Sequence, residues 1–238
     1  MIDTSIDFTG KTVCIIGGSS GIGNATAQAF RGCGAEVHVT GTRASEADYA
    51  ADEGSDLNAG DDAAIIALRQ KFTRLDALVC SQGMVMYKRA EFEPENFAKV
   101  VQVNLNSLMT CAGQFYDLLK QTKGSLIIIS STAAFHATVG NPGYNASKAG
   151  AVGLTRTLGK AWAPDGIRVN GVAPGLIATK MTKVTTDNPK RREATIRSIP
   201  LGRIGDPDDM AGLVLFLASP LAGYTVGQTI IADGGLLL

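Results

Sequence analysis

The chain has 238 residues, and its 22 basic side chains balance 22 acidic ones. No overall electrostatic field therefore favours nucleic acid or an anionic membrane, and we expect the partners to be small molecules and other copies of the chain. The length suits one α/β domain over residues 1–238. The first ten residues lack the basic and apolar segments of a signal peptide, which predicts a cytoplasmic protein.

Short apolar runs alternate with longer helical stretches along the chain. The predicted strands are Val13–Ile16, Glu36–Val39, Ala77–Cys80, Leu126–Ile129, Arg168–Val172 and Thr229–Ile231. The predicted helices are Gly21–Gly32, Asp61–Phe72, Pro94–Lys120, Tyr144–Trp162 and Pro207–Ala218. Because strands this uniformly apolar are buried on both faces, the order predicts an α/β fold with a doubly wound parallel sheet and helices on both faces.

A glycine-rich turn connects the first predicted strand to the first predicted helix. Glycine permits a tight turn and close approach of a pyrophosphate, and the helix N-terminus offers N–H groups and a positive dipole end. The pattern predicts a phosphate-binding turn, and a plain glycine-rich connection is the alternative. The candidate cofactor-binding residues here are Gly17, Ser19, Ser20, Gly21, Ile22 and Gly23.

The end of the second predicted strand bears on the choice of cofactor. An acidic residue at this place accepts hydrogen bonds from the adenosine ribose and repels the extra phosphate of NADP. This chain has no carboxylate there, and Thr42 and Arg43 can instead bind a 2′-phosphate. We therefore expect NADP(H), with NAD(H) as the alternative if Arg43 stacks on adenine or points into solvent.

Tyr144 and Lys148 lie four residues apart, on one face of a predicted helix. A nearby ammonium favours the phenolate, so such a tyrosine can exchange a proton near neutral pH. Ser131, thirteen residues before Tyr144, follows a predicted strand and can donate a hydrogen bond to a developing alkoxide. Its neighbour Ser130 should point to the opposite face of the sheet.

The spacing of the glycine turn, with Ser131, Tyr144 and Lys148, resembles the short-chain dehydrogenase/reductase (SDR) family, whose members share an NAD(P)-binding Rossmann fold. The resemblance implies an oxidoreductase that transfers a hydride between a nicotinamide dinucleotide and a carbonyl or secondary alcohol substrate. It makes Tyr144 the acid/base, Ser131 the carbonyl-binding residue, and Lys148 the group that lowers the tyrosine pKa and holds the nicotinamide ribose. Asn104 matches the asparagine that ties a water chain to that lysine.

The resemblance assigns further residues to the cofactor. Asp56 and Leu57 correspond to the pair that lines the adenine pocket, although counting back from the next helix makes Asn58 the equivalent of Asp56. The backbone of Ile177 and the hydroxyl of Thr179 correspond to groups that hold the nicotinamide carboxamide. The full set is Asp56, Leu57, Gly83, Tyr144, Lys148, Pro174, Gly175, Ile177 and Thr179.

The chain departs from the family pattern at two places. Ile16 replaces a threonine before the glycine turn, and Cys80-Ser81-Gln82-Gly83 replaces Asn-Asn-Ala-Gly. Cys80 has no His or Lys beside it in sequence, so we do not expect a nucleophilic thiolate. The four cysteines and two histidines also lack the spacing of a metal site, so we expect reduced thiols and no metal.

The polar stretch 179–200 interrupts the alternation of strands and helices, and it predicts either a loop or small helical lid at the substrate edge, or a surface excursion. Apolar residues near the predicted site indicate a pocket for an apolar substrate, or ordinary core: Met84, Met86, Tyr87, Phe135 and Met181. The resemblance implies a homotetramer or dimer, and the apolar ending Leu236–Leu238 favours such an interface.

Two classes of function remain open from the sequence. An active enzyme needs Asn104, Ser131, Tyr144 and Lys148, and all four are present. A non-catalytic dinucleotide-sensing regulatory protein needs only the glycine turn and an adenine pocket. A nucleic-acid-binding domain has no basic stripe to support it, and no apolar run approaches the length of a membrane span.

Overall fold

The computed structural model describes residues 6–42 and 54–238. Within these ranges, seven parallel strands form one sheet in the order β3-β2-β1-β4-β5-β6-β7. The strands are β1 (Thr12–Ile16), β2 (Glu36–Gly41), β3 (Gly54–Asp56), β4 (Ala77–Cys80), β5 (Ser125–Ile129), β6 (Arg168–Pro174) and β7 (Thr229–Ala232). The chain winds from β1 out to β3, returns to β4 beside β1, and then winds the other way to β7. The predicted doubly wound parallel sheet is confirmed.

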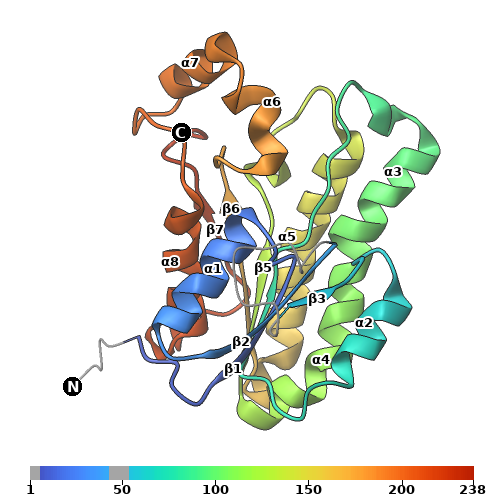
Figure 1. Ribbon diagram of the computed structural model, residues 1–238, viewed down its shortest axis with the longest axis vertical. Coiled ribbons are helices and arrows are strands. Elements are labelled where there is room, and N and C mark those ends of the chain that lie inside the picture. Colours follow the sequence, from blue (N-terminus) through green and yellow to red (C-terminus); the bar gives the residue numbers. More distant parts are fainter. Residues whose placement is uncertain (1–5, 43–53) are drawn as a thin grey trace.

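Helices cover both faces of the sheet (Figure 1). One face carries α1 (Gly21–Gly32) and α8 (Pro207–Ala218), which pack against each other. The other carries α2 (Asp62–Arg69), α4 (Ser107–Thr122) and α5 (Pro142–Trp162), with α3 (Pro94–Val101) packed on α5. None of the helices in the described ranges is both long and apolar enough to cross a membrane.

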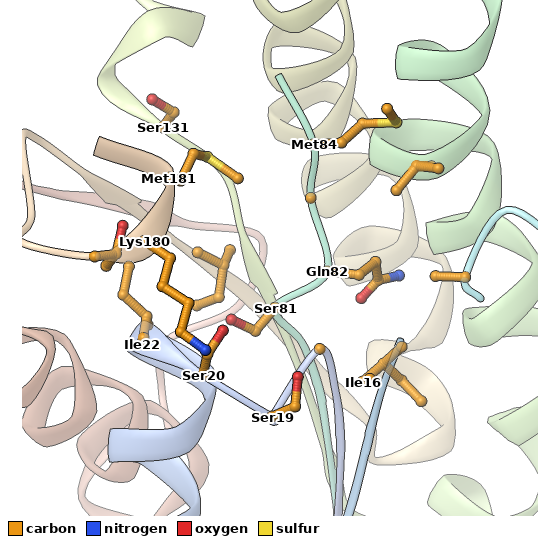
Figure 2. Close-up of a pocket in the computed structure, with 18 of the residues that line it drawn as sticks. Ile16, Ser19, Ser20, Ile22, Ser81, Gln82, Met84, Ser131, Lys180 and Met181 are labelled. Carbon is orange, nitrogen blue, oxygen red and sulfur yellow. The ribbon is translucent and has the colours of Figure 1, made fainter. Parts of the chain in front are cut away.

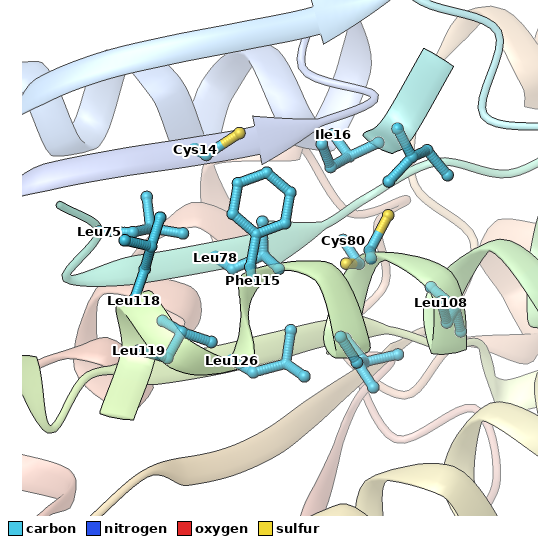
Figure 3. Close-up of a cluster of buried hydrophobic side chains, with 14 of the residues drawn as sticks. Cys14, Ile16, Leu75, Leu78, Cys80, Leu108, Phe115, Leu118, Leu119 and Leu126 are labelled. Carbon is cyan, nitrogen blue, oxygen red and sulfur yellow. The ribbon is translucent and has the colours of Figure 1, made fainter. Parts of the chain in front are cut away.

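Each central strand divides its side chains between two hydrophobic layers, since neighbouring residues of a strand point to opposite faces. In β1, Val13 and Ile15 join the layer beneath α1 and α8. Cys14 and Ile16 join the layer beneath α2 and α4, with Phe115 between the strands and the helices (Figure 3). This burial on both faces explains why the strands are continuous apolar runs in the sequence.

Two elements differ from the predictions. The helix predicted over Pro94–Lys120 is divided into α3 and α4 by a π-helical turn at Gln102–Asn106, which places an extra residue in the helix around Asn104. The strand β3 was not predicted, because Gly54–Asp56 is short and polar; it forms by pairing with β2, from Val39 opposite Gly54 to Gly41 opposite Asp56.

The segment 179–200 is largely helical, and its role as a lid stays a prediction. It contains a 3₁₀ turn at Lys180–Thr182, then α6 (Lys183–Thr186) and α7 (Pro189–Ser198), and none of these elements has a fully buried residue. The two helices lie together beyond the top of the sheet in Figure 1. The segment therefore lies at the edge of the sheet that is formed by the carboxyl ends of the strands.

Candidate active site

A cavity of about 520 Å³ lies at the carboxyl ends of the central strands. It spans the gap between β1 and β4, where the winding reverses, which is the usual ligand position in such sheets. Most predicted site residues line it, and Figure 2 shows several of them. The predicted residues in the lining are Gly17, Ser19, Ser20, Gly21, Ile22, Thr42, Leu57, Gly83, Ser131, Tyr144, Lys148, Pro174, Gly175, Ile177 and Thr179.

The glycine turn forms the floor of the middle of this cavity. Gly17 has φ +80°, and a Cβ there would lie 2.6 Å from the backbone nitrogen of Gln82. α1 starts at Gly21 with no side-chain cap and no acidic residue in its first turn, so its first N–H groups keep their capacity for an anion. Gly23 lies behind the turn, against the backbone of Gly17. These residues fit the pyrophosphate of a dinucleotide.

The adenine side of the cavity favours one of the two registers left open by the sequence. Leu57 and Asn58 line the cavity, whereas Asp56 ends β3 at an exposed position outside the lining. The structure therefore places Asn58, and not Asp56, in the cavity lining, and a contact of either residue with adenine stays a prediction. Thr42 reaches the cavity from the end of β2, and Arg43 lies outside the described residues.

Tyr144 stands in the first turn of α5, at the opposite end of the cavity. The Ser131 side chain is close enough to affect the Tyr144 pKa. Burial raises the pKa of the Tyr144 phenol above its usual value, the Ser131 side chain lowers it, and the nearby Tyr87 and Glu91 raise it further. The balance keeps the phenol protonated at neutral pH.

Lys148 follows one helical turn later and is almost completely buried. Its Nζ donates a hydrogen bond to the carbonyl of Ile129 at 2.9 Å and lies 5.7 Å from the centre of the Tyr144 ring. Burial lowers the pKa of Lys148 to about 8. Lys148 was predicted to lower the Tyr144 pKa, but it is not among the groups that affect that pKa, which burial of the phenol raises.

The two neighbouring serines have different partners, but both line the cavity and both lie beyond the end of β5, so the predicted alternation of the strand does not separate them. Ser131 caps a short 3₁₀ turn, where its Oγ accepts from the Ala133 N–H at 3.1 Å, and it faces the cavity. Ser130 is buried, and its hydroxyl donates to the Lys148 carbonyl at 2.9 Å. Ser131 therefore affects the Tyr144 pKa, while Ser130 is hydrogen-bonded to the helix that carries Lys148.

Asn104 lies behind the cavity, in the π-helical turn, and is completely buried. Its Oδ1 accepts from the Met84 N–H at 2.8 Å, and its Nδ2 donates to the Met84 carbonyl at 2.9 Å and to Ser147 Oγ at 3.2 Å. These bonds tie the segment after β4 to α5. The predicted link from Asn104 through water to Lys148 stays a prediction.

The segment after β6 closes the cavity over the glycine turn. A Cβ on Gly21 would lie 3.1 Å from Thr179, and Lys180 extends toward Ser20 in Figure 2. The Thr182 hydroxyl donates to the Ile177 carbonyl at 2.6 Å and forms a capping box with Thr179. Thr182 therefore fixes the conformation of this turn. The contact of Ile177 and Thr179 with a carboxamide stays a prediction.

Comparison with known proteins agrees with this geometry. The sequence model for the family described as enoyl-(acyl carrier protein) reductase matches residues 17–237. The 3-oxoacyl-[acyl-carrier-protein] reductase FabG of Rickettsia felis is 37% identical over 241 residues, covering 98% of this chain and 99% of its own. The chain belongs to the short-chain dehydrogenase/reductase family. This membership makes it an NAD(P)-dependent oxidoreductase, and the sensor alternative is set aside.

Other relatives of this SDR have different substrates. The 2-dehydro-3-deoxy-D-gluconate 5-dehydrogenase of Bacillus subtilis is 36% identical over 250 residues, covering 98% of this chain and 97% of its own. A candidate NAD(P)-dependent gluconate 5-dehydrogenase from Beutenbergia cavernae, solved with NADP at low occupancy, aligns with TM-score 0.92 at 30% identity over 98% of both chains. The RhlG/NADP complex of Pseudomonas aeruginosa aligns with TM-score 0.87 at 29% identity over the full length of both.

Glu91 is part of the SDR site that the sequence reasoning missed. Its carboxylate is 1% exposed, and Oε1 accepts from the Met86 N–H at 2.9 Å and from Asn141 Nδ2 at 3.2 Å. Oε2 accepts from the Tyr144 N–H at 2.9 Å. The carboxylate therefore caps the first turn of α5 and fixes it to the chain after β4. Glu91 lies 53 residues before Tyr144, so no local spacing reveals this role.

We expect Glu91→Gln to lower the free energy of unfolding by about 1–3 kcal/mol, because one of the three donors to the buried carboxylate would then face an amide NH₂. Chemical denaturation measures the loss. The matched control is the exposed Glu93→Gln, whose effect should stay within about 0.5 kcal/mol. Equal effects of the two substitutions would show that the cap contributes nothing.

Cys80 is not equipped for nucleophilic chemistry, in agreement with the sequence prediction. Contact with Cys111 and burial raise the pKa of its thiol well above the usual value. All four cysteines are free thiols in the structure. The residues described include no cluster of three or more His, Cys, Asp or Glu side chains that could hold a metal.

Proposed function

We propose that this SDR reduces a ketone or aldehyde with NADPH, and oxidises the corresponding alcohol with NADP, using Tyr144 as the acid/base. The observation that carries the proposal is the arrangement of Ser131, Tyr144 and Lys148 at one end of a cavity whose floor is the glycine turn. When bound, the dinucleotide supplies or accepts the hydride. Lys180 adds a positive side chain above the turn, which suits a pyrophosphate.

The protein groups have separate tasks in this reaction. In reduction, the Ser131 hydroxyl orients the substrate oxygen and Tyr144 donates its phenolic proton to it. The raised pKa of Tyr144 keeps that proton available at neutral pH. In alcohol oxidation the phenol must first lose its proton, so higher pH favours that direction. We assign to Lys148 the task of holding the nicotinamide ribose.

The experiment that tests the proposal follows oxidation of NADPH and of NADH by the purified protein with a panel of carbonyl compounds. The panel should contain 3-oxoacyl thioesters and keto-sugar acids, because relatives of both kinds are similar to this chain. Met84 and Met181 give the substrate end an apolar lining, so we expect the acyl compounds to react faster. Dinucleotide binding without turnover on any substrate would restore the sensor alternative.

We expect NADPH to bind more tightly than NADH, since no carboxylate follows β2 and Arg43 follows Thr42 there. Arg43→Ala should raise the Kd of NADPH about tenfold or more and leave that of NADH nearly unchanged. Fluorescence titration measures both constants, with the exposed Lys99→Ala on α3 as the control for loss of one positive charge. Tighter binding of NADH by the unmodified protein would refute the NADP(H) assignment.

We also propose that the protein is cytoplasmic and assembles as a homotetramer. The edge strand β7 leaves Ile231 42% exposed, and Leu238 at the end of the chain is fully exposed. An apolar edge of this kind favours an interface between copies. Analytical ultracentrifugation should give four times the chain mass, and a monomeric mass would refute the assembly.

A further inference from the structure

Gln82 is a buried polar side chain with one atom left without a partner. The residue is 5% exposed, and its Nε2 donates to Ser107 Oγ at 3.0 Å and lies 3.9 Å from Cys111 Sγ. Its Oε1 is buried and has no hydrogen-bond partner among the residues that the structure describes. A buried carbonyl oxygen in this state costs free energy unless a ligand or water donates to it.

The orientation of the Gln82 amide follows from its neighbour. The Ser107 hydroxyl donates its only hydrogen to the Val103 carbonyl at 2.6 Å, so toward Gln82 it can only accept. The amide nitrogen must therefore face Ser107. The oxygen is left as an acceptor, and in Figure 2 it lies on the side of the amide that faces the glycine turn.

Gln82 belongs to the end of the cavity opposite Tyr144. It lines the cavity together with the apolar Ile16, Leu57, Ala59 and Val103, and its backbone lies against Gly17. With the pyrophosphate over the glycine turn and the nicotinamide at the Tyr144 end, the adenine falls at this end. Gln82 also stands where the family pattern has alanine, so the unpaired oxygen is a feature of this chain.

We propose that the Gln82 side-chain oxygen accepts a hydrogen bond from the 6-amino group of the adenine of the cofactor. The inference rests on the proposed dinucleotide binding. The amino group carries the only N–H donors of the adenine ring of the dinucleotide, and the apolar neighbours of Gln82 suit a flat base better than ribose hydroxyls. A purine with oxygen at position 6 would place an acceptor against an acceptor, so Gln82 selects an amino purine.

The test measures the Kd of NADPH and of its hypoxanthine analogue, in which oxygen replaces the adenine amino group. The unmodified protein should bind NADPH about tenfold more tightly than the analogue. In Gln82→Met, which keeps the volume but has no carbonyl acceptor, the ratio should fall close to one. Gln82→Ala, the residue of the family pattern, tests the same point if the methionine variant does not fold.

The outcomes separate this inference from the proposed function. Equal binding of the two dinucleotides by the unmodified protein, or a preference that persists in both Gln82 variants, would overturn the role of Gln82 and leave the oxidoreductase proposal intact. Failure of the unmodified protein to bind either dinucleotide would overturn both. Thermal unfolding without ligand verifies that each variant is folded.

Discussion

Tyr144→Phe is expected to lower kcat by about 10²–10⁴-fold while the Kd of NADPH changes little. The substitution keeps the aromatic ring in the first turn of α5 and removes only the phenolic hydroxyl. Because the proton donor is lost and the glycine turn is untouched, catalysis and cofactor binding should separate. Steady-state kinetics on the best substrate of the panel, with fluorescence titration of NADPH, measures both quantities.

The matched control for this substitution is Tyr116→Phe. Tyr116 donates a hydrogen bond to Asp165 at 2.6 Å, near the carboxyl end of α5 and away from the cavity lining. Its loss should leave kcat nearly unchanged. Full turnover by Tyr144→Phe would remove the acid/base role from Tyr144, and a parallel loss of NADPH binding would indicate a structural role instead.

The parts of the fold that could be predicted are those whose cause lies within a short stretch of chain. Strands buried on both faces must be largely apolar, so Ala77–Cys80 and Leu126–Ile129 stand out in the sequence. β3 has no such signal, because Gly54–Asp56 is held by its ladder with β2. The π-helical turn at Gln102–Asn106 was also hidden, since its residues continue an ordinary helical pattern.

The residues of the site likewise divide into those that local spacing predicts and those that depend on contacts between distant segments. Tyr144 and Lys148 could be paired from helical spacing, and Ser131 from its place at the end of β5. Two features arise only when distant segments meet, so no sequence pattern predicts them: the capping of α5 by Glu91, and the unpaired oxygen of Gln82. The spacing also predicted a lowered pKa for Tyr144, whereas the pKa is raised by burial of the phenol. Spacing reveals which groups are near each other but not how deeply they are buried.

The burial of Lys148 leads to a prediction in which stability and activity change in opposite directions. Burial lowers the pKa of its ammonium to about 8, against 10.5 for an exposed lysine. Below pH 8 the group is charged in both folded and unfolded protein, and the folded state bears the desolvation cost, about 3 kcal/mol. Between pH 8 and 10.5 the unfolded state binds more protons, so this cost is relieved as pH rises.

Lys148→Met should therefore raise the free energy of unfolding of the cofactor-free protein at pH 7, by up to about 3 kcal/mol. The loss of the hydrogen bond to the Ile129 carbonyl reduces this gain. The gain should disappear by about pH 10.5. Turnover should fall sharply in the same variant, because the ammonium that we propose to hold the nicotinamide ribose is gone. Urea denaturation of Lys148→Met and of the unmodified protein at pH 7 and pH 10.5 measures the difference in their free energies of unfolding. Titrations of groups that both proteins share cancel in this difference.

Lys160→Met, at an exposed position on the same helix, provides the control and should show no gain at either pH. If Lys148→Met lost stability equally at pH 7 and pH 10.5, the buried ammonium would not be a cost to the fold. If it gained stability at pH 7 and kept full turnover, Lys148 would have no part in the reaction. The expected combination, a more stable and less active protein, would show that the fold tolerates a destabilising buried charge because the cofactor site requires it.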